Sequence, residues 1–241
     1  GSGLVAAAAF EVYASGVDLT YSFTKALPVE IRERYEIREV RNAAALLAAT
    51  NPDEFDEVVA VLRDFRLSRD DVLGAGGNKS DVARRLDLAF RDLGWREARH
   101  DTRVTSVLQL QPWPPGEGVA VVEESEVRNE GYKVDNVKGR VALDVEWNAK
   151  DGNLDRDLAA YRALYEAAII DVGVIITRTQ ADLRAAVLEL DPDSSKFSTT
   201  TTTNLEKLEP RLTRGDSGGC PVLAIAISSR CIDFTLDGEA Q

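Results

Sequence analysis

Hydrophobic positions in the first hundred residues recur mostly with the period of an α-helix. Residues 29–50 are rich in Glu, Arg, Ala and Leu, which favours one long helix. A second helix is predicted from Pro52, and its apolar stripe consists of Phe55, Val58, Val59 and Leu62. Ser80 is placed to cap a third helix that stops at Gly94, with a core face of Val82, Leu86, Ala89, Phe90 and Leu93. The N-terminal part is therefore expected to be mainly helical.

From residue 104 onward the pattern changes to that of β-strands. Residues 104–110 alternate, and residues 119–122 form a short apolar run. The runs at residues 172–177 and 221–227 are continuously apolar, which is typical of strands buried on both faces. Helical stripes separate these segments, at Leu154, Leu158, Tyr161, Leu164 and Tyr165, at residues 181–190, and after a capping box over residues 203–206. These elements predict an α/β fold with a central mixed β-sheet flanked by helices.

The length of 241 residues suits one large domain. We expect residues 1–3 to be a cloning scar and residues 4–241 to form a single domain. Within it, residues 4–103 would be the mainly helical part and residues 104–241 the α/β core. No apolar run is long enough to predict a transmembrane helix.

Composition limits the chemistry. One histidine and two cysteines, Cys220 and Cys231, leave no disulfide framework, no four-ligand zinc site and no histidine cluster, and they fit a reducing, cytoplasmic setting. The 41 acidic residues outnumber the 29 Lys and Arg, for a net charge of −12. On average, such a surface argues against a nucleic-acid partner.

Three carboxylates stand close together on a predicted hairpin. Asp144 and Glu146 are two residues apart on an alternating strand, so they share one face. Asp135 precedes a Lys-Gly-Arg turn, and the hairpin would bring it beside them. Oxygen donors without His or Cys suit a hard cation such as Mg²⁺. The alternative is an acidic, solvated face of a half-exposed strand.

Around these acids the sequence resembles the active-site segment of BamHI/BglII-type type II restriction endonucleases, especially the BglII/BstYI branch of the PD-(D/E)XK nucleases. Asp135, a spacer of eight residues and Asp144 match the pattern, and Glu146 occupies the position of its lysine. Further matches occur in the same order along most of the chain, in segments 10–13 (FEVY), 94–97 (GWRE), 170–174 (IDVGV) and 218–221 (GGCP).

The resemblance implies a restriction-endonuclease-like core and a homodimer that hydrolyses double-stranded DNA at a short palindrome, with a cognate DNA methyltransferase in the same system. By position, Asp135 and Asp144 would bind Mg²⁺, and Glu146 would orient or deprotonate the attacking water. The loop Asn148, Ala149 and Lys150 would face DNA. Relatives in this branch favour GATC-centred sites. The alternative is a non-catalytic DNA-binding relative on the same fold.

Other motifs leave alternatives open. Lys79, in the glycine-rich segment 74–80, could contact a DNA phosphate, although a plain turn between helices explains it equally well. Lys133 is a further candidate to line the DNA cleft. The segment 215–219 (GDSGG) looks like a serine-protease nucleophile motif, but His100 lacks the surroundings of a catalytic base, so a glycine turn is favoured. The predicted stripe over residues 154–165 could serve the core or a dimer interface.

Overall fold

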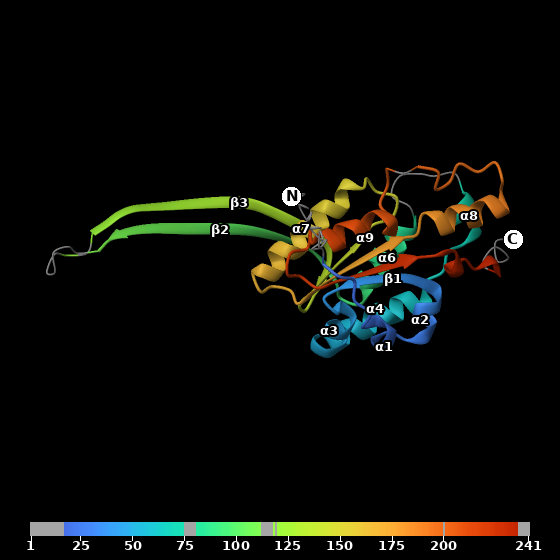
Figure 1. Cartoon of the computed structure of the whole chain (residues 1–241), viewed down its shortest axis with the longest axis horizontal. Coiled ribbons are helices and arrows are strands. Elements are labelled where there is room, and N and C mark those ends of the chain that lie inside the picture. Colours follow the sequence, from blue (N-terminus) through green and yellow to red (C-terminus); the bar gives the residue numbers. More distant parts are fainter. Residues whose placement is uncertain (1–16, 75–80, 112–117, 119, 200, 236–241) are drawn as a thin grey trace, which may run out of the picture.

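The computed structural model describes residues 17–74, 81–111, 118, 120–199 and 201–235. Its framework is a six-stranded mixed sheet in the order β1-β6-β5-β4-β3-β2. The strands are β1 (Tyr35–Val40), β2 (Arg96–Leu110), β3 (Ala120–Lys138), β4 (Val141–Val145), β5 (Val172–Arg178) and β6 (Val222–Ile227). Strands β4, β5 and β6 run parallel, and the outer pairings are antiparallel (Figure 1). The predicted fold class is confirmed.

The parallel strands form where the sequence is continuously apolar. Every residue of β4, β5 and β6 is buried. Helices must cover both faces of such strands, because neither face carries enough polar side chains to meet water. The strands predicted at 172–177 and 221–227 are therefore confirmed. Because β4 pairs with β5 and is buried like it, the carboxyl end of β4 lies inside the protein.

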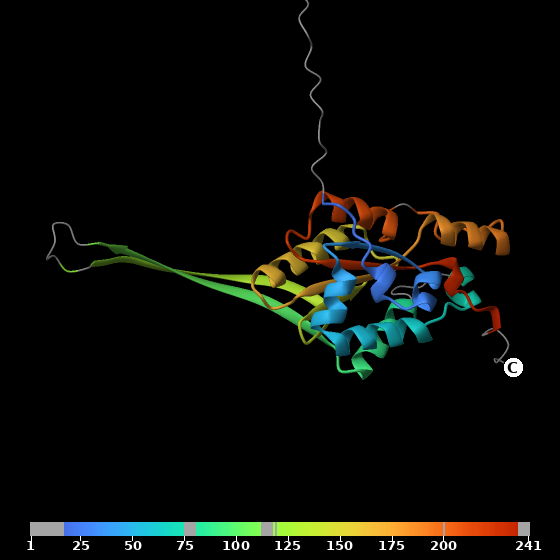
Figure 2. The ribbon, with the colours of Figure 1, turned by 60° about the horizontal axis from the view of Figure 1, so that its bottom comes forward.

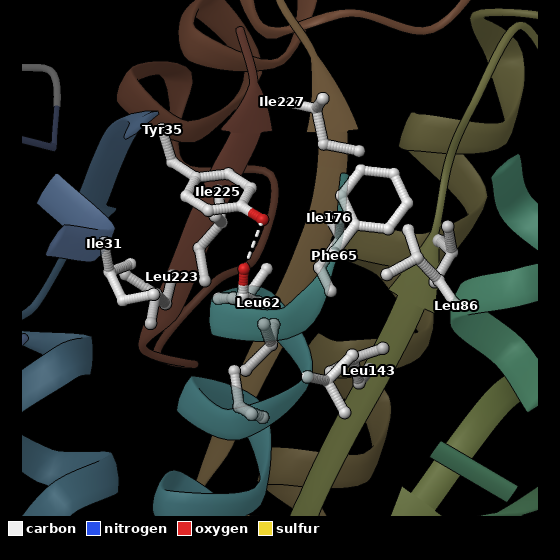
Figure 3. Close-up of a cluster of buried hydrophobic side chains, with 14 of the residues drawn as sticks. Ile31, Tyr35, Leu62, Phe65, Leu86, Leu143, Ile176, Leu223, Ile225 and Ile227 are labelled. Carbon is white, nitrogen blue, oxygen red and sulfur yellow. Dashed lines mark hydrogen bonds between the residues drawn. The ribbon is translucent and has the colours of Figure 1, made fainter. Parts of the chain in front are cut away.

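Two helical layers cover the sheet. One layer packs on the face formed by Leu143, Val174 and Ile225. Its helices are α1 (Phe23–Ala26), α2 (Val29–Arg34), α3 (Ala43–Thr50), α4 (Pro52–Asp64), α5 (Arg69–Leu73), α6 (Asp81–Asp92) and α8 (Ala181–Leu190). Figure 3 shows this core, where the Tyr35 hydroxyl donates a 2.7 Å hydrogen bond to the Leu62 carbonyl. Helices α7 (Gly152–Glu166) and α9 (Leu205–Arg214) cover the other face.

The long helix predicted over residues 29–50 is wrong. It is interrupted by β1, which pairs antiparallel with β6 from Tyr35 opposite Ile227 to Val40 opposite Val222. Burial alternates along the first residues of β1, as it does along a strand. The long-range pairing thus overrides the local helix propensity. Arg41 and Asn42 then adopt positive φ angles, which turn the chain into α3.

Strands β2 and β3 form a two-stranded arm that projects from the body (Figures 1 and 2). The arm is longer than the predicted segments 104–110 and 119–122. Its described side chains between residues 101 and 133 are exposed, so no core contact imposes a hydrophobic period on them. At its base, Glu57 of α4 accepts hydrogen bonds from Trp95 Nε1 (2.7 Å) and Lys138 Nζ (2.5 Å).

Several smaller predictions can also be compared with the structure. Helices α4 and α6 form as predicted, although Leu93 is exposed rather than part of the core.

The helices after β4 also differ in detail from the prediction. The N-cap of α9 is Asn204 and not Thr203, because the Asn204 side chain accepts a hydrogen bond from the Lys207 N–H. The stripe on α7 is core at Leu154, Leu158, Tyr161 and Leu164, whereas Tyr165 is exposed. Among the described residues, no helix is long and apolar enough to span a membrane.

Helix α7 is seated on the sheet through Tyr161 and Gly173. The Tyr161 ring lies where a β-carbon on Gly173 would be, and its hydroxyl donates a 2.6 Å hydrogen bond to the Val174 carbonyl. Only a glycine at this position of β5 lets α7 approach so closely.

We predict that Gly173→Ala lowers the free energy of unfolding by about 2–3 kcal/mol, because the added methyl group displaces the buried Tyr161 ring. Urea unfolding measures the change. Gly152→Ala is the matched control, since a β-carbon there meets no atom within 4 Å; it should be neutral or stabilise by up to about 0.5 kcal/mol. Equal effects of the two substitutions would contradict the predicted role of Gly173.

Candidate active site

The hairpin of β3 and β4 brings Asp135 next to Asp144. Their strands pair from Lys138 opposite Val141 to Asn136 opposite Leu143. The same register continued by one residue places Asp135 opposite Asp144, and the Asp135 N–H donates a 2.9 Å hydrogen bond to Asp144 Oδ1. Gly139 makes the tight turn possible with a φ of 52°.

Asp144 and Glu146 lie at the carboxyl end of β4, facing α7. Leu143 and Val145, the residues that alternate with them, belong to the core on the opposite face of the sheet. Both acids are almost fully buried, with exposed fractions of 2% and 3%. The alternative of a solvated acidic strand face is therefore wrong for these two residues, whereas Asp135 is exposed.

A further acid, Asp157 of α7, completes this cluster. It is 1% exposed; its negative charge raises the pKa of Asp144, and the charge of Glu146 raises the pKa of Asp157. Sequence reasoning missed it, although a signal was present: Asp157 interrupts the apolar stripe of α7 between Leu154 and Tyr161. A charge on the buried face of a helix points to a function, because its burial must be compensated.

Burial raises the pKa of all three inward-facing acids. For Asp144, desolvation is the main cause and the charge of Asp157 adds to it. Desolvation likewise dominates the raised pKa of Glu146 and of Asp157, and the two carboxyl groups also influence each other. Ionising all three groups together at neutral pH is therefore unfavourable, and a further positive charge among them would favour it.

The donor set fits a hard cation. Asp144 Oδ2 and Asp157 Oδ2 are buried without a hydrogen-bond partner in the described structure. Carboxylate oxygens are the ligands that Mg²⁺ and similar ions prefer. No three acidic, His or Cys side chains among the described residues already stand at ligand spacing, so binding an ion would require these side chains to move closer together.

The predicted DNA-facing residues occupy different environments. The loop after β4 places Asn148 and Lys150 at the surface. Asn148 Oδ1 accepts a 2.7 Å hydrogen bond from Arg178, and the Ala149 carbonyl accepts one of 2.9 Å from the Thr203 N–H. Lys133 lies on the arm, 3.6 Å from the Glu97 carboxylate. Lys79 lies outside the described residues.

The serine-protease motif is not an active site in this structure. The Ser217 hydroxyl is buried and donates to the Cys220 carbonyl at 3.1 Å. His100 lies on the arm, paired with Tyr132. The segment is the glycine turn that leads into β6, as favoured from the sequence.

A mixed sheet flanked by helices, with buried acids at the end of a central strand, is consistent with a restriction-endonuclease-like core. The model of the restriction endonuclease BglII/BglIII family matches residues 35–227, which run from the first residue of β1 to the last residue of β6. The chain belongs to this family. It is thus a type II site-specific deoxyribonuclease that acts on double-stranded DNA, and its family implies a divalent metal cofactor. A comparison with curated proteins gave no match.

Because the acids have raised pKa values, the metal-free protein should lose stability as pH rises. Below about pH 3 both the folded and unfolded states hold these protons. As pH rises through the ordinary Asp and Glu pKa values of 3.8 and 4.5, the unfolded state releases them first, at a cost of about 1.4 kcal/mol per unit of pKa difference. We predict that Asp157→Asn loses less stability than the parent protein between pH 5 and pH 8, in urea unfolding with EDTA.

Glu166→Gln is the control for this measurement, since Glu166 is exposed at the far end of α7 and pairs with Arg162. It should follow the parent protein at every pH. A loss of equal size in the parent protein and in Asp157→Asn would show that the buried acids do not govern this pH dependence.

Proposed function

We propose that this chain is a Mg²⁺-dependent restriction endonuclease of the BglII/BstYI branch of the PD-(D/E)XK nucleases, cutting both DNA strands at a short, GATC-centred palindrome. The observation that carries the proposal is the pair of unpartnered, buried oxygens of Asp144 and Asp157, with Asp135 beside them. A protein keeps such atoms desolvated at a cost, which a bound cation repays.

Asp135, Asp144 and Glu146 have distinct tasks in this proposal. Asp135 and Asp144 hold the ion, one from the solvent side and one from the buried side of the hairpin. Glu146 orients the attacking water and accepts its proton, and its raised pKa suits a group that exchanges a proton near neutral pH. When bound, the divalent cation polarises the phosphodiester and offsets the charge that develops on it.

DNA is proposed to approach the carboxyl end of β4. Asn148, Ala149 and Lys150 follow that strand directly and form the candidate loop for base and phosphate contacts. Lys133 and Lys79 are candidates for phosphate contacts. Because the chain has a net charge of −12, binding without metal or the correct sequence should be weak and should fall early with rising salt.

The proposal extends to the wider system. Residues 4–241 would act as a single nuclease domain in the cytoplasm, and a cognate DNA methyltransferase would protect the host site. Two copies of the chain would act together, because each contributes one acidic cluster and both strands of a palindrome must be cut.

A plasmid digest with Mg²⁺ tests the activity. We predict discrete fragments for the parent protein and at least about a hundredfold slower cutting for Asp135→Ala and Asp144→Ala, because each removes a ligand. Both variants should still bind duplex DNA in Ca²⁺. Glu166→Gln, on the same side of the sheet but outside the cluster, should cut at the parent rate.

Cleavage at the parent rate by both alanine variants would show that the site is misassigned. Duplex binding without fragments in either Mg²⁺ or Mn²⁺ would instead favour the non-catalytic DNA-binding relative. Sequencing the ends of the fragments identifies the recognition site and tests whether it is centred on GATC.

Sedimentation of the protein with a cognate duplex tests the dimer. We predict a complex that contains two chains of 26.3 kDa per duplex. Mixing the parent protein with excess Asp144→Ala should then convert double-strand cuts into nicks, because mixed dimers carry one working site. A complex with one chain per duplex would contradict the homodimer.

A further inference from the structure

Arg156 forms ion pairs with two of the buried acids, Glu146 and Asp157. It precedes Asp157 on α7, and its Nη2 lies 3.1 Å from Asp157 Oδ1 and 3.9 Å from Glu146 Oε1. Its Nε also donates to Asp157 Oδ1 at 3.3 Å. The two carboxylates are buried, whereas the Arg156 side chain is 54% exposed. The guanidinium therefore lies at the boundary between the acidic cluster and solvent.

Two basic residues on the strands that flank β4 have partners outside the acidic cluster. Lys133 faces Glu97, and Arg178 donates to Asn148, Gln180 and Thr202. In the part of the chain that the structure describes, the ion pairs of Glu146 and Asp157 are made with Arg156. Arg156 thus supplies the positive charge that these acids need when no metal ion is present.

A divalent cation would change this balance. An ion held by Asp135 and Asp144 would lie beside the unpartnered Asp157 Oδ2, in the same acidic cluster that Arg156 contacts through Asp157 Oδ1 and Glu146 Oε1. Its two positive charges would repel the guanidinium at short range. The side chain can leave because it is half-exposed and its stem is flexible. A guanidinium released at this boundary presents a planar set of donors that matches phosphate oxygens.

We propose that Arg156 is the counter-ion of Glu146 and Asp157 in the metal-free enzyme and binds a phosphate oxygen of the DNA once a divalent cation is present. The inference rests on the proposed active site and adds a residue of α7 to it. It makes binding of metal and of DNA cooperative, because the ion releases the group that holds the phosphate.

The test separates the two roles of Arg156, because losing the guanidinium should strengthen metal binding but slow DNA cleavage. Arg156→Gln removes a competitor for the acids, so Mn²⁺ should bind the DNA-free protein about three- to tenfold more tightly in calorimetric titration. The same variant should cleave DNA at least about thirtyfold more slowly in single turnover at saturating Mg²⁺, because a phosphate contact is lost. Arg156→Lys should lie between the two.

Arg162→Gln is the matched control, since Arg162 also lies on α7 but pairs with the exposed Glu166. It should alter neither Mn²⁺ affinity nor the cleavage rate. Thermal unfolding of each variant monitors the fold. Tighter Mn²⁺ binding together with slower cleavage supports the proposal. Unchanged values in Arg156→Gln, or a joint loss of metal binding, cleavage and thermal stability, would overturn it, since the latter indicates a merely structural role.

The parent protein serves as the reference for the activity itself. If it cuts no DNA in Mg²⁺ or Mn²⁺, the proposed nuclease function fails, and the Mn²⁺ titration alone still decides whether Arg156 is the counter-ion. If the parent protein cuts and Arg156→Gln cuts equally fast, the phosphate contact is refuted while the nuclease function stands.

Discussion

The burial of Asp144, Glu146 and Asp157 between the sheet and α7 is the constraint on which the site depends. Removing three carboxyl groups from water costs free energy that the surrounding apolar core must supply. That core is available because β4, β5 and β6 are buried on both faces and α7 sits close to the sheet through Tyr161 and Gly173. The packing thus keeps the three carboxyl groups buried, an environment in which a positively charged ligand stabilises their ionised forms.

The loop after β4 is fixed by a second buried charge. Arg178, at the end of β5, is 1% exposed, and burial lowers its pKa to about 10, so it is still a cation at neutral pH. It donates to Asn148 Oδ1 and to Thr202 Oγ1, which ties the loop to the segment before α9. The Arg178 guanidinium also lies over the Phe197 ring, which adds a cation–π interaction. The surface that follows the acids is therefore built on a rigid support.

Local patterns revealed much of this arrangement, and the exceptions share a physical cause. The central strands and the hairpin acids follow from short apolar runs and spacing. Strand β1 could not be predicted from local pattern because its partner strand β6 lies almost two hundred residues further along the sequence. Asp157 interrupts an apolar stripe, but this signal indicates a functional residue only once the burial of its carboxyl group is known. The arm has exposed residues on both faces, so no periodic pattern marks its length.

The charge of the arm also limits where DNA can bind. Residues 104–111, 118 and 120–127, the described outer part of the arm, contain no Lys or Arg. Closer to the body, Arg103 and Arg128 both pair with Glu126, and Arg99 pairs with Asp101 and Glu130. Phosphate binding needs cations that are free to replace the counterions of DNA. The net charge of −12 first suggested no nucleic-acid partner, yet local exceptions to that average decide where DNA can bind. Lys150 follows β4 directly, and in our proposal a metal ion releases Arg156 from its acids. We therefore expect DNA at the carboxyl end of β4 rather than along the outer arm.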